Sequence, residues 1–223
     1  MKDEWEPKYE FTGETAPLHL VTHSLTLNRI RAIRPFGSVK AGELGGWIED
    51  QKNLSQRDLS WVGDNAAVFG NAKVYGEARV GGRAEIYDHA EIYGNARVYG
   101  STRVCSNARV YGDAWIYENA MVYENAIVSG NARIHGDIII GGKTKLRGEA
   151  DVFRKRQILT IGPIGSREAF TTFYRGKERI MVSCGCFNGP LEAFITKVRE
   201  KYGTTNRAAV YLAAVELAKI QLE

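Results

Sequence analysis

Residues 74–85 read VYGEARVGGRAE, which is two copies of one six-residue unit. An aliphatic residue opens each unit, a glycine stands third and an alanine stands fifth. The aliphatic position recurs at every sixth residue, without a break, from Val62 to Val152. A short fixed period of this kind indicates a solenoid, in which each unit is buried only by its neighbours.

The unit favours short strands over helix. A glycine in most units would cost a helix about 1 kcal/mol each, whereas glycine and asparagine accept the left-handed backbone of tight turns. Side chains alternate along each strand, so Arg97 and Tyr99 point outward and Val98 points inward. Three such sides close a triangular coil of about 18 residues, and each stacked coil adds about 4.8 Å. The array therefore predicts about five coils around an aliphatic axis.

The repeat resembles the hexapeptide-repeat family, whose fold is the left-handed parallel β-helix. The resemblance covers residues 62–153, our expected central domain, and implies a mainly β protein. The family includes acyltransferases, carbonic anhydrases and non-catalytic scaffolds, so the fold does not define an activity. Trimers are usual in this family, and the resemblance therefore implies a homo-oligomer, with a trimer as the favoured form.

Residues 1–61 are expected to form an N-terminal β cap, because an open coil leaves unpaired strand edges that need a cover. Short strands are expected at 18–21 and 30–33, and Trp47 and Trp61 are large enough to plug the end of the coil. This segment resembles the entry of bacterial and phage hexapeptide-repeat proteins, some of which are described as acetyltransferases on fold alone.

Residues 154–223 are expected to form a small C-terminal α+β module. The sequence predicts a strand at 158–161, a turn at 162–166, and a hairpin of 171–174 with 180–184. A helix follows Pro190 and a second begins near Asn206. The expected buried face of the second helix consists of Tyr211, Val215, Ala218 and Leu222. This module resembles a tail module of phage and prophage proteins.

The composition limits the cellular location and the partners that we expect. The net charge is +4, which permits an anionic partner without requiring one. No apolar run approaches the roughly 18 residues that span a bilayer, and the acidic N-terminus shows no secretory signal. Three cysteines do not make a disulfide framework. We therefore expect a cytoplasmic protein of a bacterial host, with no membrane partner.

Two histidines lie within the array, and neither is expected to be catalytic: His89 is expected to be structural, and His135 to be structural or to contact a ligand. His89 takes a turn place that Asn71 and Asn107 hold in neighbouring coils, and His135 takes an outward place in the column of Tyr117. An acyltransferase needs a histidine base and usually a loop that interrupts the repeats. We predict no catalytic residues; the alternative is a coenzyme A-dependent acyltransferase with His89 or His135 as the base.

No metal or cofactor is expected. Two histidines do not supply the three that a carbonic-anhydrase zinc site needs. Cys184 and Cys186 are separated by one residue, which is too close for a zinc knuckle. We expect both thiols to be buried and to point to the same face of a strand.

One outward side of the coil combines arginines with aromatic rings. Its predicted ligand-binding residues are Arg79, Arg97, Tyr99, Trp115, Tyr117, Arg133 and His135. Arginines bind phosphate and flat rings stack on bases, although such ladders also stabilise β surfaces without binding anything. The later coils also place apolar residues outward, which predicts a surface covered by the C-terminal helices or by other subunits. These residues are Trp115, Met121, Ile127 and Ile139.

We therefore predict a non-catalytic, oligomeric β-solenoid of phage or prophage type. Its predicted task is to bind or sequester a small anionic, nucleotide-like ligand used in host defence signalling, and no nucleic-acid partner is expected. Two alternatives stay open at this point: the acyl-coenzyme A-dependent acyltransferase, and a purely structural or virion-associated scaffold.

Overall fold

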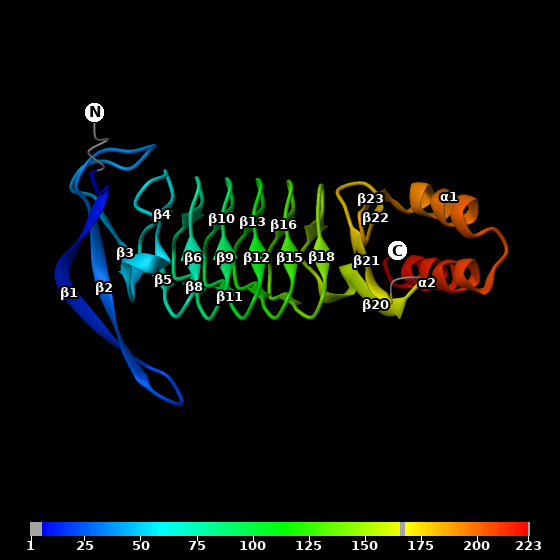
Figure 1. Cartoon of the computed structure of the whole chain (residues 1–223), viewed down its shortest axis with the longest axis horizontal. Helices are drawn as coiled ribbons and strands as arrows, with labels where there is room; N and C mark the ends of the chain where they lie inside the picture. The colour runs from blue at the N-terminus through cyan, green and yellow to red at the C-terminus, as the bar shows by residue number, and fades with distance from the viewer. Residues whose placement is uncertain (1–5, 166–167, 223) are drawn as a thin grey trace.

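The computed structural model describes residues 6–165 and 168–222. The chain forms a rod with a β hairpin at one end, a stack of coils in the middle and two helices at the other end (Figure 1). Neither helix within the described residues has the length and apolar character that crossing a membrane requires.

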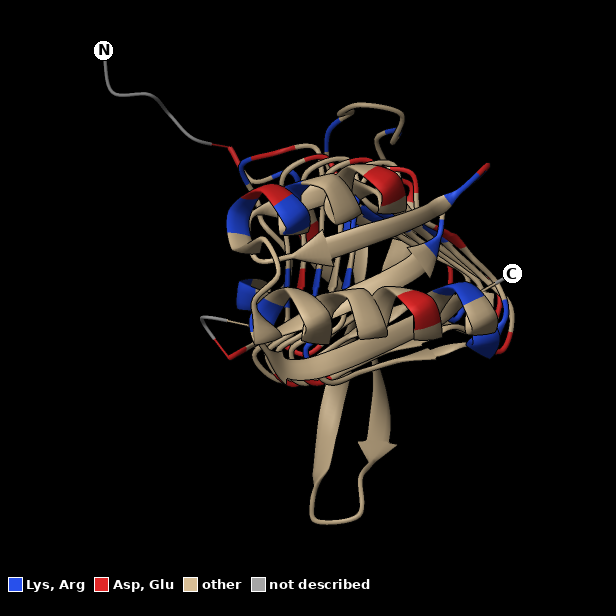
Figure 2. Cartoon of the chain, turned by 90° about the vertical axis from the view of Figure 1, so that its right-hand side faces the viewer, with Lys and Arg blue, Asp and Glu red and all other residues tan. Residues whose placement is uncertain are grey.

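The N-terminal region is a long hairpin joined to the first coil. Strands β1 (Tyr9–His19) and β2 (Ser24–Ala32) pair antiparallel, and β2 pairs with β3 (Leu44–Ile48). β3 then pairs in parallel with one strand of the solenoid, β5 (Ala67–Val68), and a 3₁₀ turn follows at Gln51–Asn53. The hairpin projects sideways from the rod (Figures 1 and 2). Its two strands, of 11 and 9 residues, are much longer than the short strands that the sequence predicts at 18–21 and 30–33.

Sixteen two-residue strands follow at six-residue intervals. They are β4 (Trp61–Val62), β5 (Ala67–Val68), β6 (Lys73–Val74), β7 (Arg79–Val80), β8 (Glu85–Ile86), β9 (Glu91–Ile92), β10 (Arg97–Val98), β11 (Arg103–Val104), β12 (Arg109–Val110), β13 (Trp115–Ile116), β14 (Met121–Val122), β15 (Ile127–Val128), β16 (Arg133–Ile134), β17 (Ile139–Ile140), β18 (Lys145–Leu146) and β19 (Asp151–Val152).

Every third strand joins the same parallel sheet. The sheets run β1-β2-β3-β5-β8-β11-β14-β17, β4-β7-β10-β13-β16-β19 and β6-β9-β12-β15-β18. Arg97 pairs with Arg79 on one side and with Trp115 on the other, so the predicted 18-residue register is confirmed. The stack has about six coils, not five, because β3 and a bridge from Leu54 to Val74 start a coil before Val62.

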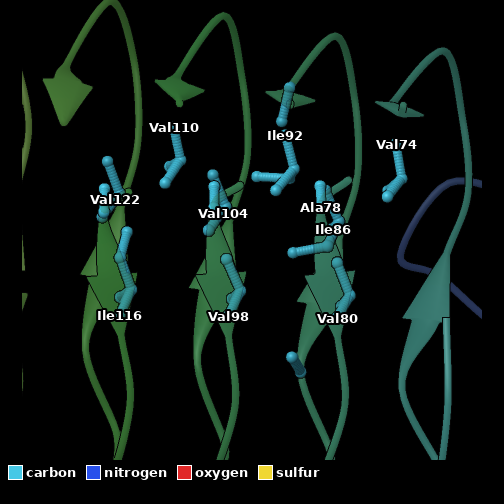
Figure 3. Close-up of a cluster of buried hydrophobic side chains, with 14 of the residues drawn as sticks. Val74, Ala78, Val80, Ile86, Ile92, Val98, Val104, Val110, Ile116 and Val122 are labelled. Atoms are coloured by element: carbon cyan, nitrogen blue, oxygen red, sulfur yellow. The ribbon is translucent and has the colours of Figure 1, made fainter. Parts of the chain in front are cut away.

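The axis of the solenoid is a column of branched aliphatic side chains (Figure 3). Val80, Val98 and Ile116 stack in successive coils, and each is almost completely buried. Alanine at the fifth place of the unit fills the corners, as Ala78 and Ala96 do with no exposed surface. The β-branched residues suit this position because they pack well on a pleated surface.

The third place of the unit has a left-handed backbone in every coil. Glycine holds most of these places, but five of them carry a side chain at positive φ: Asp64, Asp88, Ser106, Glu118 and Glu124. Four of the five are acids whose carboxylates accept a hydrogen bond from the backbone N–H one coil later, for example Asp64 Oδ2 from Gly82 N at 2.7 Å. This bond compensates for the strain of a non-glycine residue in that conformation.

Trp61 and the buried Lys8, which donates a hydrogen bond to the carbonyl of Ser60, attach the hairpin to the first coil. The ring of Trp61 packs edge-on against Tyr9 and Phe36, so the prediction that it plugs the coil end is confirmed. The same prediction is wrong for Trp47, which takes an outward place on β3 beneath the guanidinium of Arg29. The next residue of β3, Ile48, faces inward instead, since side chains alternate along the strand.

The C-terminal module is a sheet covered by two helices. The sheet order is β20 (Ile158–Ile164), β21 (Ala169–Arg175), β22 (Ile180–Cys184) and β23 (Phe187–Pro190), after a 3₁₀ turn at Lys155–Gln157. Helices α1 (Leu191–Tyr202) and α2 (Asn206–Leu222) pack on it (Figure 2). All four residues predicted for the buried face of α2 are buried.

Several expectations for this module are wrong. Gly162, Pro163 and Ile164 belong to β20, which passes through the predicted turn with a shift of register, and Ser166 lies outside the described residues. Cys186 is exposed in the turn between β22 and β23, and only Cys184 is partly buried. The turn reverses the chain between the two thiols, so they do not share a strand face.

The helices do not cover the outward apolar residues of the later coils. They pack against β20–β23 at the end of the rod, and Ile139 stays 55% exposed. Cys105 takes an outward place but is buried. The pairing of β11 with β8 and β14 sets it between Tyr87 of the preceding coil and Tyr123 of the next.

Candidate binding groove

A groove of about 1000 Å³ runs along the six-stranded sheet at its N-terminal end. Strands β7, β10 and β13 supply its length through Arg79, Arg97 and Trp115, which pair directly across the sheet. The loop between β2 and β3, together with Leu59 and Trp61, closes one end. The six-residue period produces this alignment, because residues 18 apart occupy the same place in successive coils.

Four of the seven predicted ligand-binding residues line this groove: Arg79, Arg97, Tyr99 and Trp115. The other three lie farther along the same sheet and do not line it: Tyr117, Arg133 and His135. The seven residues therefore divide into four that line the groove near the hairpin and three that lie outside it, toward the C-terminal module.

Two aromatic residues of the groove are presented to solvent, whereas Trp61 at its end is buried. Trp115 is 41% exposed and Tyr99 is 39% exposed. The guanidinium carbon of Arg97 lies 4.8 Å from the centre of the Trp115 ring, a cation–π contact that orients both groups. Tyr99 lies over Gly81, where a side chain would collide with its ring. The groove thus offers flat rings next to fixed positive charge.

His135 lies in a stack of rings outside the groove. Its ring centre is 4.7 Å from that of Tyr117 and 5.2 Å from that of Phe153. Its two ring nitrogens lie 3.8 Å from carboxylate oxygens of Glu118 and Asp151. This environment fits a structural ring in an aromatic ladder.

His89 is exposed at the turn between β8 and β9, and although it belongs to a coil that contributes to the groove, it does not line it. Its Nε2 lies 3.3 Å from the amide nitrogen of Asn71, which holds the same place one coil earlier. The left-handed residue of this turn is Asp88, not His89. The structure does not bring His89 and His135 together, because they occupy different sides of the coil.

Sequence reasoning missed the end wall of the groove. Phe36 and Val39 exchange two backbone hydrogen bonds, of 3.1 and 2.9 Å, around a turn formed by Gly37 and Ser38. Gly37 has φ +52°, and a Cβ on it would lie 2.7 Å from Nη2 of Arg79. The Gly-Ser pair signals a turn in the sequence, but nothing in the sequence places that turn against β7.

Four carboxylates also line the groove: Glu43, Asp64, Glu77 and Asp113. Three of them accept hydrogen bonds from the protein: Glu43 from Lys40 N at 3.0 Å, Asp64 from Gly82 N, and Asp113 from the Asn95 amide at 2.9 Å. Each carboxylate keeps further lone pairs and its charge, but among the described residues none of the four forms an ion pair with Arg79 or Arg97.

A buried cation stands behind the end wall. The side chain of Lys8 is fully buried, and burial lowers its pKa to about 8, although Asp58 acts in the opposite direction. The positive charges of Arg79 and Arg34 also lower the pKa of Lys8. Their effect shows that three cations lie within electrostatic reach of one another at this end of the groove.

No group of three or more histidine, cysteine, aspartate or glutamate side chains in residues 6–165 and 168–222 is arranged to hold a metal ion.

The three parallel sheets around one aliphatic axis define a β-solenoid repeat protein. Two stretches of the array, residues 90–106 and 114–130, match the family model described as the YdcK beta-solenoid repeat. Both stretches begin on an inward, fully buried alanine and lie within the coils described above. The search of curated proteins finds no match to the chain. The similarity supports the repeat class and carries no activity to this protein.

Proposed function

We propose that this β-solenoid is a binding protein whose groove takes a small, planar, anionic ligand of the nucleotide type. The observation that carries the proposal is that Arg79, Arg97, Tyr99 and Trp115 line one groove. Aromatic faces stack on bases, and guanidinium groups bind phosphate through paired hydrogen bonds. A rigid wall of this kind is preorganised, which lowers the entropy cost of binding.

The proposal assigns the protein a sequestering role, as expected for a phage or prophage protein that removes a signalling nucleotide of the host. Two facts support binding over acyl transfer. The array has no loop that interrupts the coils, and neither His89 nor His135 lines the groove. The scaffold alternative predicts instead that the groove takes no small ligand.

Titration calorimetry with a panel of AMP, ADP, ATP and cyclic dinucleotides tests the proposal. We expect Trp115→Ala to weaken the best ligand of the panel by about tenfold or more, because stacking on a base contributes about 1–3 kcal/mol. Arg97→Glu should weaken it further, because it removes the cation and adds a like charge.

Arg133→Glu is the matched control, since it makes the same change at the same place of the unit, two coils later and outside the groove. It should leave the affinity unchanged. No binding by any nucleotide, or binding equally affected by all three variants, would contradict the proposal. Stabilisation by coenzyme A that is lost in His135→Ala would favour the acyltransferase instead.

We also propose that the chain associates with copies of itself. Ile139 remains 55% exposed at the end of the eight-stranded sheet, next to the half-buried Met121, and exposed apolar patches mark interaction surfaces. We expect Ile139→Glu to lower the molar mass measured by light scattering, whereas Arg109→Glu, an exposed change on another sheet, should not. A wild-type chain that is monomeric at every concentration would contradict this part.

A further inference from the structure

The closed end of the groove carries hydrogen-bond donors that the protein itself does not use. Within residues 6–165 and 168–222, the guanidinium of Arg79 forms no hydrogen bond and no ion pair. It is half-buried and held against the turn at Gly37, where the absence of a side chain leaves it room. A half-buried guanidinium without a counter-ion is costly, and an anion would relieve that cost.

Trp61 adds a second, independent sign of a ligand. It is 4% exposed and lines the groove, yet its indole N–H has no partner among the described residues. The indole nitrogen can only donate, and buried polar groups are nearly always paired. Nε1 would lie 3.5 Å from a Cβ on Gly63, so the missing side chain leaves space beside the indole N–H, and an acceptor placed there would satisfy it.

The turn at Gly37 and Ser38 supplies further donors. Both residues line the groove, and neither their backbone N–H groups nor the Ser38 hydroxyl bond to another described residue. Successive N–H groups near a positive-φ residue are a common way to bind an anion. The turn and Arg79 approach the same point from two parts of the chain that lie far apart in the sequence.

Charged side chains behind the end wall also act on the potential at Arg79. Lys8 and Arg34 reinforce the positive potential at Arg79, and Asp58, hydrogen-bonded to Lys8, offsets one of these charges. The carboxylates that line the groove nearest this end, Glu43 and Asp64, already accept backbone N–H bonds. Those two carboxylates keep their negative charge, so what this end offers an anion is the guanidinium of Arg79, which pairs with neither of them among the described residues, next to the aromatic walls of the groove.

We propose that this end is a phosphoryl subsite formed by Arg79, the Gly37–Ser38 turn and the indole N–H of Trp61. It rests on the proposed function and deepens it, because it gives the ligand a direction. The terminal phosphate lies against Arg79, and the planar part of the ligand lies toward Tyr99 and Trp115.

Pyrophosphate, which has charge but no ring, is the probe that isolates this subsite. We expect it to bind and to shift the indole N–H resonance of Trp61 downfield in a ¹⁵N-correlated spectrum, with the peak assigned by its loss in Trp61→Phe. Arg79→Gln and Trp61→Phe should each weaken pyrophosphate by about tenfold, because each removes a donor to a charged acceptor. Trp47→Phe is the control, since Trp47 lies outside the groove; it should leave the affinity unchanged.

The outcomes separate the two proposals. Nucleotide binding that depends on Trp115, with no effect of Arg79→Gln and no shift of the Trp61 resonance, would overturn the subsite and leave the proposed function standing. Pyrophosphate binding that depends on Arg79, without any contribution from Trp115 to nucleotide affinity, would support the subsite and contradict the stacking groove. Should Trp61→Phe lose its native circular dichroism, the Arg79→Gln titration and the wild-type resonance still decide the question.

Discussion

Replacing Gly100 with alanine is expected to destabilise the solenoid by about 3 kcal/mol, because two penalties combine. Gly100 has φ +78°, a conformation that L-residues with a side chain rarely adopt. A Cβ on Gly100 would also lie 2.6 Å from the carbonyl oxygen of Glu118 and 2.7 Å from its nitrogen. Both atoms belong to the backbone of the next coil, so neither moves without disturbing the stack.

Ser106→Ala is the matched control for this change. Ser106 holds the same place of the unit at φ +58° and already carries a Cβ. We expect it to change stability by less than about 1 kcal/mol, because alanine keeps the Cβ that this place already accommodates and removes only a hydroxyl. Urea unfolding followed by circular dichroism measures both variants. Equal midpoints for Gly100→Ala and Ser106→Ala would show that the close approach of the coils does not govern this place.

Lys8→Met is expected to destabilise the protein by about 3 kcal/mol, because it leaves buried acceptors without a donor. The ammonium of Lys8 donates to the carbonyl of Ser60 at 2.7 Å, to the carbonyl of Asp58 at 2.9 Å and to the Asp58 carboxylate at 3.2 Å. Methionine preserves an apolar side chain of similar length but removes every donor and the cation that lies 5.0 Å from the centre of the Phe36 ring. The hairpin would lose its anchor to the first coil, and protease sensitivity near residue 58 should rise.

The pH dependence gives this prediction a second readout. The pKa of Lys8 is lowered from 10.5 to about 8 by burial, so the folded state loses its proton at a lower pH than the unfolded chain does. Between pH 8 and 10.5 the unfolded state therefore binds more protons, and stability rises with pH in this window. The difference in unfolding free energy between wild type and Lys8→Met should grow by up to about 1.4 kcal/mol per pH unit there. A constant difference across the window would contradict the lowered pKa.

The repeat could be predicted almost completely from the sequence. Its strands, the 18-residue register and the inward alanines follow from the period alone, because residues 18 apart must meet in neighbouring coils. The outward column of Arg79, Arg97 and Trp115 follows from the same register. Whether that column was flat or hollowed could not be predicted, since the hollow arises from a loop outside the repeat.

The non-repeating segments show where sequence reasoning stopped. Trp47 was expected to plug the coil, but the pairing of β3 with β5 sets its face, and no local pattern encodes that pairing. β23 was missed because Phe187–Pro190 is too short to alternate, and it forms only against β22. Strand pairings of this kind depend on contacts between distant residues.

The sequence by itself determined a stack of coils and the identity of each outward column, because one six-residue period fixes both the burial and the register. Only the tertiary structure decided that the groove has a closed, donor-rich end. That end requires Gly37 to meet Arg79 and Lys8 to meet Ser60, across separations of roughly 40 to 50 residues. The Lys8 contact forms because a buried cation must find partners, and the Gly37 contact depends on where the loop folds, and neither placement has a periodic signal in the sequence.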